Sequence, residues 1–216
     1  MLKVVSIVIS LFLILTLTSF VKADKPDLKI IINIPSRKLE LYESTKKIKS
    51  YPIGVGKANS PTPIGNFFSV ISKVKNPKWQ NPYKSYTGTV INSGNSNPLG
   101  TRWIGFFRDS MGEYGIHGTN SPTSVGKYSS HGCIRMKMKD VEELFEYVEL
   151  GTPVRINNCE FKVDLADNII FITRYPPLYK GKQNHFKCIN DQIKEIGISY
   201  YVMSDELSIL KDIKNW

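Results

Sequence analysis

The residues with the clearest potential for chemistry are a cysteine and two histidines in the middle of the chain. His117 lies in the segment GIHGTN at 115–120, and His131 and Cys133 lie in the segment SSHGCIRM at 129–136. A thiolate is a strong nucleophile, and a nearby imidazole can take the thiol proton and later return it to a leaving amine. These residue types therefore suit acyl transfer through a thioester.

Two glycines flank these reactive groups. Gly132 would let the backbone turn tightly before Cys133, which could aim amide N–H groups at an oxyanion. The plainer interpretation is that Gly118 and Gly132 are ordinary turn glycines and that Cys133 is a small buried hydrophobe. A zinc site is a further alternative, since His117, His131 and Cys133 have suitable ligand types. Their spacing lacks the close CxxC or HxxxH pair of such sites, and no fourth ligand is evident.

The chain begins with the features of an export signal. Lys3 is followed by an uncharged apolar stretch over 4–21 and by Val21-Lys22-Ala23, a pattern suited to signal peptidase. We predict a secretory signal peptide over 1–23, with an uncleaved membrane anchor as the alternative. Either outcome places the remainder in the periplasm or at the cell wall. No later run is long and apolar enough to span a bilayer.

The charge of the mature chain limits its partners. Removing residues 1–23 takes away two lysines and no acids, leaving 29 − 2 = 27 basic and 19 acidic residues, a formal charge of +8 over 216 − 23 = 193 residues. This length is enough for one well-cored domain. The charge favours either a Lys-rich soluble surface or attraction to an anionic cell-wall or lipid surface. No nucleic-acid partner is predicted, because the chain lacks an aromatic-basic motif.

The cysteine count is odd, which is informative for an exported chain. Of the three cysteines, one must stay unpaired or pair outside the chain. We predict that Cys133 is the free, reactive thiol. Cys159 and Cys188 are then either buried or bridged, and their Cα separation decides between these alternatives.

Short strands are predicted around the central segment. The first three form an antiparallel meander, and a strand over 114–117 would deliver His117 to a rim. Trp103 and Tyr114 could line a cleft, although aromatic residues near strands are more often core. The stretch 75–100 is rich in Asn, Pro, Gly and Ser, which predicts long loops that could include a substrate lid. The predicted strands are 28–34, 38–43, 48–55, 66–74, 102–107, 114–117 and 154–156, with a hairpin of 161–163 and 169–172.

One helix is well specified after the central segment. Asp140 is the predicted N-cap, Glu143 completes a capping box, and Gly151 ends the helix before Pro153. Its apolar face is made by Val141, Leu144, Phe145 and Val148. Beyond 181 the chain changes character, and 182–216 is predicted to be a small α/β extension. It would contain a helix before Gly197, a strand over 198–203 and a last helix capped by Ser204.

The central motifs together closely resemble the signature of the L,D-transpeptidase catalytic domain. The matching residues are HGTN at 117–120 and SHGCIRM at 130–136, with PTPIGNF at 61–67, NPLG at 97–100, GTPV at 151–154 and the helix after the signature in support. The resemblance covers roughly 28–157 and, more loosely, extends to about 179. Together with the N-terminal pattern and the change in composition after 181, it predicts a signal peptide (1–23), a catalytic domain (24–181) and the extension (182–216). Arg135 stands where many members have Asn, which could affect donor recognition.

The resemblance implies a fold and a set of residue roles. The fold would be mainly β, a sandwich of mixed sheets with few helices. Cys133 would be the acylated nucleophile and His117 the proton acceptor and donor, oriented by the Gly118 carbonyl. The amides of Gly132 and Cys133 would form the oxyanion hole, with Ser130 and His131 shaping the pocket. The choice of His117 over His131 rests on the family and not on spacing.

The resemblance also implies a reaction. The donor would be a peptidoglycan stem tetrapeptide, whose third-residue carbonyl is attacked by the Cys133 thiolate with release of D-alanine. An amine of a neighbouring stem would then give a 3→3 cross-link, whereas water as acceptor would make the enzyme an L,D-carboxypeptidase. Carbapenems are expected to acylate the cysteine, and no metal or organic cofactor is implied. A non-catalytic wall-binding module is the alternative from another class.

Overall fold

The structure is a computed structural model that describes residues 26–80, 90–94, 96–167, 169–179, 181 and 184–198. The predicted signal peptide lies outside the described residues, as do the predicted strand beyond Ile198 and the predicted last helix. Within the described parts, no helix is long and apolar enough to cross a membrane.

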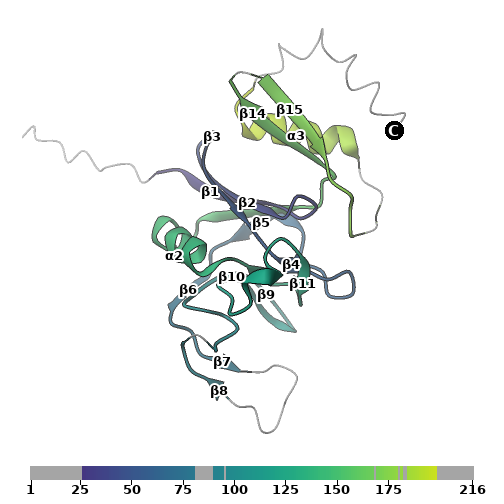
Figure 1. Cartoon of the computed structure of the whole chain (residues 1–216). Coiled ribbons are helices and arrows are strands. Elements are labelled where there is room, and N and C mark those ends of the chain that lie inside the picture. Colours follow the sequence, from purple (N-terminus) through teal and green to yellow (C-terminus); the bar gives the residue numbers. More distant parts are fainter. Residues whose placement is uncertain are drawn as a thin grey trace, which may run out of the picture.

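A five-stranded mixed sheet forms one layer of the fold (Figure 1). The predicted antiparallel meander of the first three strands is confirmed. The strand at 153–157 pairs in parallel with the first of these strands, at 28–33. The alternation along the first strand buries Ile30 and Ile32 against the second layer. In sheet order the strands are β3 (Lys46–Pro52), β2 (Lys38–Glu43), β1 (Leu28–Asn33), β13 (Pro153–Asn157) and β5 (Gly65–Ser69).

A four-stranded mixed sheet forms the second layer and carries the central motifs. Its strands, in order, are β12 (Ile134–Arg135), β10 (Gly112–His117), β9 (Arg102–Asp109) and β6 (Ser72–Lys75). Short pairs join β4 (Val55–Gly56) to β11 (Tyr128–Ser130) and β7 (Trp79–Gln80) to β8 (Val90–Ile91), and a 3-10 turn covers Pro122–Ser124. The mainly β fold with mixed sheets is therefore confirmed.

The prediction of one strand over 66–74 is wrong, because β5 and β6 belong to different sheets. At the break, the Val70 N–H donates to the Thr152 carbonyl, while the next N–H, that of Ile71, donates to the Gly105 carbonyl. The backbone thus passes from the first layer to the second within two residues. Apolar periodicity does not contain this information, because it does not show which distant strand each half pairs with.

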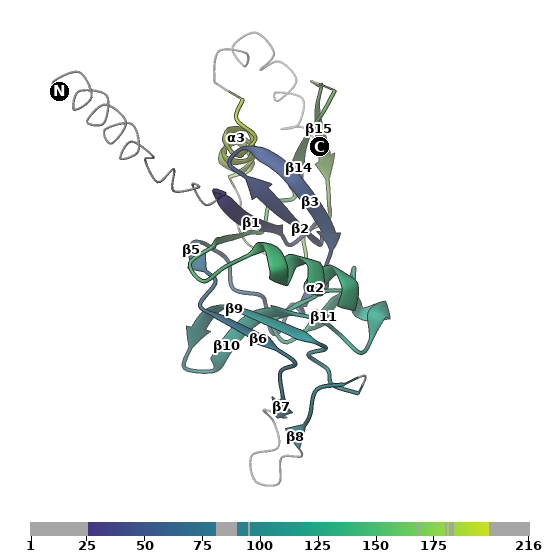
Figure 2. The ribbon, with the colours of Figure 1, turned by 90° about the vertical axis from the view of Figure 1, so that its left-hand side faces the viewer.

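Helix α2 (Met138–Tyr147) lies between the two layers along one side of the molecule (Figure 2). The predicted apolar face is confirmed, because Val141, Leu144, Phe145 and Val148 are all buried in the main core.

The predicted N-terminal cap of this helix is wrong. The N-cap is Lys137, which makes no side-chain capping bond, and Asp140 lies within the first turn. Glu143 instead accepts hydrogen bonds from Lys49 and Tyr51 of β3, at 2.5 and 3.0 Å. The tertiary partners of Glu143 therefore replace the local capping box. The C-cap is Val148, and Gly151 lies in the following turn at φ +87°.

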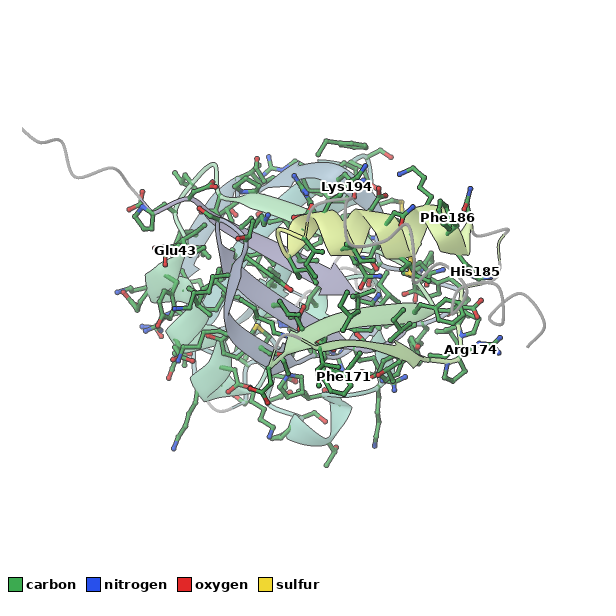
Figure 3. The ribbon with its side chains drawn as sticks, turned by 90° about the horizontal axis from the view of Figure 1, so that it is seen from above. Glu43, Phe171, Arg174, His185, Phe186 and Lys194 are labelled. Atoms are coloured by element: carbon green, nitrogen blue, oxygen red, sulfur yellow. A yellow bond between two sulfur atoms is a disulfide. The ribbon has the colours of Figure 1, made fainter. Side chains whose placement is uncertain are left out.

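The predicted hairpin and the predicted helix before Gly197 are both present and share a second core. The hairpin consists of β14 (Phe161–Ala166) and β15 (Ile169–Arg174), and the helix is α3 (His185–Glu195). Val163 packs with Ile189 and Ile193 in this core. His185, which begins α3, contacts the Phe161 ring edge-on at 5.2 Å. Figure 3 shows α3 and the hairpin lying over the strands of the first layer.

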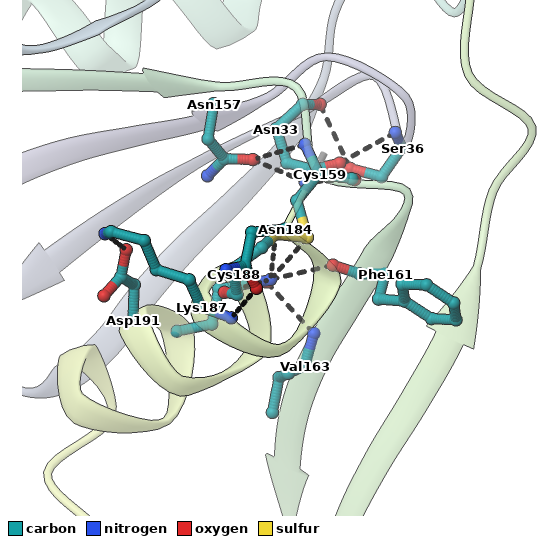
Figure 4. Close-up of a disulfide and its surroundings, with 11 residues drawn as sticks. Asn33, Ser36, Asn157, Cys159, Phe161, Val163, Asn184, Lys187, Cys188 and Asp191 are labelled. Carbon is teal, nitrogen blue, oxygen red and sulfur yellow. Dashed lines mark hydrogen bonds and ion pairs between the residues drawn. A yellow bond between two sulfur atoms is a disulfide. The ribbon is translucent and has the colours of Figure 1, made fainter. Parts of the chain in front are cut away.

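The Cys159 and Cys188 thiols are joined in a disulfide, with their Cα atoms 6.1 Å apart (Figure 4). This settles the two alternatives left open by the sequence. The bridge ties α3 to the connection between β13 and β14. The Cys159 carbonyl also accepts a hydrogen bond from Asn33 of β1 at 2.9 Å, so the bridge joins the small core to the first layer.

We expect the C159S/C188S double variant to lose about 2–4 kcal/mol of the free energy of unfolding, because the unfolded chain regains loop entropy. Urea unfolding followed by circular dichroism measures this change. The C133S variant is the matched control, since it removes a thiol without opening a disulfide. An unchanged urea midpoint in the double variant would contradict a stabilising bridge.

Candidate active site

The parallel pairing of β10 with β12 assembles the candidate site. Ile116 lies opposite Ile134, and both are buried in the main core. His117 lies opposite Arg135 in the same register. Since successive side chains in a strand point to opposite faces, His117 and Arg135 share the face opposite the core isoleucines. Cys133 directly precedes β12, so the same alternation directs it to the face that carries His117.

The His117 imidazole is buried and neutral. Its Nδ1 lies 2.5 Å from the Gly118 carbonyl oxygen. A carbonyl only accepts hydrogen bonds, so Nδ1 carries the proton and Nε2 is left as an acceptor. Burial lowers the pKa of His117 to about 4, helped by the charge of Arg135 and opposed by the Gly118 bond. At neutral pH the imidazole is therefore in the form that can take a proton.

Trp103 of β9 lies against this imidazole. The two rings stack at 5.7 Å between centroids and 18° between planes. A Cβ atom at Gly115 would stand 2.6 Å from the indole Cζ2, so only glycine lets the indole lie over β10 at this point. Trp103 is thus a neighbour of the site and not a core residue. The signal available in the sequence was only its place on the strand beside His117.

Cys133 is free and partly exposed. Burial raises the pKa of its thiol, and the negative charge of Glu113 adds to this effect. A backbone hydrogen bond with Gly115 and the charge of Arg135 act in the opposite direction but do not outweigh it. The thiol is therefore protonated at neutral pH and needs a base, the role for which His117 Nε2 is suited.

The turn before Cys133 depends on Ser130 and Gly132. Ser130 Oγ donates to the Cys133 carbonyl at 2.5 Å and accepts from the Gly132 N–H at 3.1 Å. Gly132 has φ +112°, and a Cβ there would stand 2.7 Å from Tyr114 Cε1. The Gly132 amide expected in an oxyanion hole is thus already engaged. Its use for an oxyanion would require it to exchange Ser130 Oγ for the substrate oxygen.

Gly118 has a packing role in addition to its carbonyl. A Cβ at Gly118 would stand 2.8 Å from Met138 Sδ, in the first turn of α2. The Met136 N–H donates to the His117 carbonyl at 2.9 Å, so the backbone after β12 is hydrogen-bonded to the end of β10 next to Gly118. Buried Asn97 orders the nearby loop by donating to the Pro77 carbonyl at 2.7 Å and accepting from Leu99 N at 2.8 Å. Sequence reasoning had assigned Asn97 no role.

The remaining candidates lie at the edge of the site. His131 is exposed, and Arg135 is partly buried with its backbone paired to Gly54 by two hydrogen bonds of 2.8 Å. Glu113, which sequence reasoning missed, belongs to the same face through its place on β10. In the described parts of the chain, no three His, Cys, Asp or Glu side chains gather closely enough to hold a metal ion. The zinc alternative therefore has no geometric support.

Comparison with known proteins places these features in a family. A family model described as the L,D-transpeptidase catalytic domain matches residues 27–156. A putative L,D-transpeptidase YkuD from Bacillus licheniformis is 38% identical over 128 residues, 59% of this chain and 64% of that protein. The putative L,D-transpeptidase YqjB from Bacillus subtilis is 40% identical over 134 residues, 60% of this chain and 70% of that protein. The match to YkuD thus spans less than two thirds of that relative's length.

Solved structures support the fold. The crystal structure of L,D-transpeptidase 3 from Mycobacterium tuberculosis, in complex with a faropenem-derived adduct, aligns with a TM-score of 0.50 at 18% identity. The alignment covers 62% of this chain and 61% of that chain. At this identity the likeness concerns the arrangement of the sheets and not the chemistry.

The His117 imidazole is expected to titrate near pH 4, because burial disfavours its charged form. NMR titration of the ring C–H signals, assigned by their loss in H117Q, measures this pKa. R135Q should raise the midpoint, since it removes a positive charge near the ring. A wild-type midpoint near the ordinary value of about 6.5 would contradict a buried neutral imidazole.

The same shift predicts a pH dependence of stability. Between the unfolded pKa of about 6.5 and the folded pKa of about 4, the unfolded chain binds more protons at this residue. The contribution of His117 to the free energy of unfolding should therefore fall as the pH drops through this window. Urea unfolding at pH 7 and pH 5 should show a smaller loss in H117Q than in wild type.

G115A should displace Trp103 from His117, because its methyl group would meet the indole. We expect a cost of about 1–3 kcal/mol from overpacking. Urea unfolding measures this cost, and a change in the ring C–H shifts of His117 reports the lost stacking. G181A is the matched control, since a Cβ at Gly181 meets no atom within 4 Å. Unaltered His117 shifts in G115A would show that Trp103 does not need this glycine.

Proposed function

Because the chain belongs to the L,D-transpeptidase catalytic domain family, we propose that it is an acyltransferase that cross-links peptidoglycan stem peptides. The observation that carries the proposal is the register of β10 and β12, which directs a neutral His117 and a free Cys133 to one face. Family membership alone would leave open whether the nucleophile and the base are correctly poised.

The first half-reaction follows from the protonation states. His117 Nε2 takes the proton of the Cys133 thiol, and the thiolate attacks the third-residue carbonyl of a stem tetrapeptide. The tetrahedral oxyanion collapses, the bond to the terminal D-alanine nitrogen breaks, and His117 returns the proton to that nitrogen. The products are free D-alanine and a thioester on Cys133.

The second half-reaction reverses these roles with a new amine. The side-chain amine of a neighbouring stem attacks the thioester carbonyl while His117 takes its proton. The carbon–sulfur bond breaks, the thiol recovers its proton from His117, and a 3→3 amide cross-link is released. Since the proton leaves and returns through His117 in both halves, no external acid or base is needed.

The surrounding residues have supporting roles in this proposal. The Gly118 carbonyl keeps the Nδ1 proton in place, at 2.5 Å. The Cys133 amide faces the developing oxyanion, joined by the Gly132 amide once that group leaves Ser130 Oγ. Arg135 supplies a positive charge that favours the thiolate. His131, at the exposed edge, shapes the substrate pocket.

We also propose a location and a domain organisation. The predicted signal over 1–23 would export the protein to the periplasm or cell wall, where the mature charge of +8 suits an anionic wall. The catalytic domain would span 24–181, in line with Tyr179, which is buried in the main core and donates its hydroxyl proton to the Gly56 carbonyl at 2.7 Å. The residues between, from Cys159 to Val163, pack in the second core with α3.

Reaction with β-lactams belongs to the same proposal. The M. tuberculosis structure carries a faropenem-derived adduct, and another is a complex of LdtMt1 with imipenem. An electrophilic lactam carbonyl presented to Cys133 would undergo the first half-reaction with ring opening in place of D-alanine release. Intact-mass analysis with a carbapenem should then show a single adduct, absent in C133A.

Purified protein incubated with disaccharide tetrapeptide should release D-alanine and form a cross-linked dimer. C133A should abolish both products, because no other group can form the thioester. H117A should lower the acylation rate far more than H131A, roughly a hundredfold or more. Mass spectrometry of the products and an enzymatic D-alanine assay measure these outcomes.

The product spectrum separates the alternatives. Free tripeptide without dimer would show that water is the acceptor and that the protein is an L,D-carboxypeptidase. Salt-sensitive wall binding, with neither turnover nor a carbapenem adduct, would show a wall-binding module. Full activity in C133A would show that Cys133 is not the nucleophile and would contradict the proposed chemistry.

A further inference from the structure

Glu113 is a largely buried carboxylate that the proposed reaction does not use. Its side chain is 16% exposed and lies on the β10 face that carries Gly115 and His117. Glu113 Oε1 accepts a hydrogen bond from Trp103 Nε1 at 2.8 Å and another from Ser72 Oγ. Its Oε2 is 2.5 Å from the Arg108 guanidinium. The carboxylate is thus held by donors from β9 and β6.

The sheet is shaped to admit this carboxylate. A Cβ atom at Gly105 would overlap Glu113 Oε1, so the carboxylate lies directly across β9 at that glycine. Burial raises the pKa of Glu113, but the hydrogen bonds from Ser72, Arg108 and Trp103 outweigh it and hold the pKa below its ordinary value. Glu113 is therefore charged at neutral pH and is a strong acceptor.

The indole of Trp103 connects this carboxylate to the candidate base. Its N–H is bound by Glu113, its six-membered ring lies over Gly115, and its plane stacks on the His117 imidazole. The Gly118 carbonyl fixes the other side of the imidazole through Nδ1. Two fixed neighbours leave the ring little freedom to rotate away from Cys133. Loss of the Glu113 bond would free the indole to swing and would leave its N–H unpaired.

We propose that Glu113 is a positioning residue, which holds the Trp103 indole against His117 and so keeps the imidazole aimed at Cys133. The inference rests on the proposed function in taking His117 and Cys133 as a base–nucleophile pair. The alternative is that Glu113 only anchors β9 to β10, and the experiment must distinguish this structural role from positioning.

Conservative substitutions separate the charge of Glu113 from its hydrogen bond to Trp103. The charged and titratable groups facing the thiol are Glu113 and His117 from β10 and Arg135 from β12, with a backbone hydrogen bond with Gly115. E113Q keeps an oxygen that can accept the Trp103 N–H but loses the negative charge. E113A loses both, and W103F keeps an aromatic ring but loses the N–H.

The experiment measures two quantities on the full chain. One is the rate of Cys133 alkylation by iodoacetamide as a function of pH, and the other is kcat and KM for D-alanine release from disaccharide tetrapeptide. E146Q is the matched control, because Glu146 is an exposed carboxylate on α2 that pairs with Lys75. Melting temperatures by circular dichroism identify variants that fail to fold.

E113Q should move the alkylation midpoint to lower pH by about half a unit, with kcat within about twofold of wild type. E113A and W103F should each lower kcat roughly tenfold or more at nearly unchanged KM, because a misaimed base affects the chemical step. The E113A/W103F double variant should be no slower than E113A, since both changes break one connection. E146Q should match wild type in every measurement.

Two results would overturn the inference. One is a kcat for E113A or W103F within about twofold of wild type in a variant that folds, and the other is multiplicative losses of kcat in the double variant. Failure of the proposed function gives a different pattern. If wild type released no D-alanine while the alkylation midpoint shifted in E113Q and alkylation slowed in E113A and W103F, the positioning role would stand and the peptide substrate would be wrong.

Discussion

The parallel ladder between β10 and β12 is the contact on which the rest of the site depends. It joins two segments that the 3-10 turn and β11 separate in the chain. The ladder is short, with Ile116 opposite Ile134 and His117 opposite Arg135. Burial of the two isoleucines fixes the register, because a slip of one residue would expose them and bury a charged side chain. The energy that sets the geometry of His117 and Cys133 therefore comes from the core beneath them and not from the reactive groups.

Close backbone approach is the second requirement of the site, and glycines provide it. Gly115 admits the Trp103 indole, Gly118 admits Met138, and Gly132 turns the chain beside Tyr114. Each of these glycines makes room for a large neighbouring side chain, and the neighbour of Gly115, Trp103, stacks on the imidazole. Glycine at these positions lowers the local preference for regular secondary structure but lets larger side chains pack closely against the backbone.

The unit made of β14, β15 and α3 lies on the side of the fold opposite the candidate site. It covers the outer face of the five-stranded sheet through charged side chains, among them Lys162, 3% exposed and 3.0 Å from Glu40. A buried ion pair of this kind fixes orientation more than it adds stability. The disulfide to Cys188 and the small core around Val163 supply the attachment. The candidate site lies on the four-stranded sheet, so the five-stranded sheet stands between it and this unit (Figure 1).

Residue types and motifs alone determined the family, the predicted nucleophile and base, most strands and the apolar face of α2. Local periodicity and a dense signature carry that information, because they depend on residues close in the chain. Only the tertiary structure decided that 66–74 divides between two sheets, that Glu143 pairs with β3 instead of capping α2, and that Cys159 bridges Cys188. It also placed Trp103 against His117 and Glu113 against the Trp103 indole. These facts depend on contacts between segments that are distant in the chain. The residue spacing within one segment does not specify which distant segment it will contact.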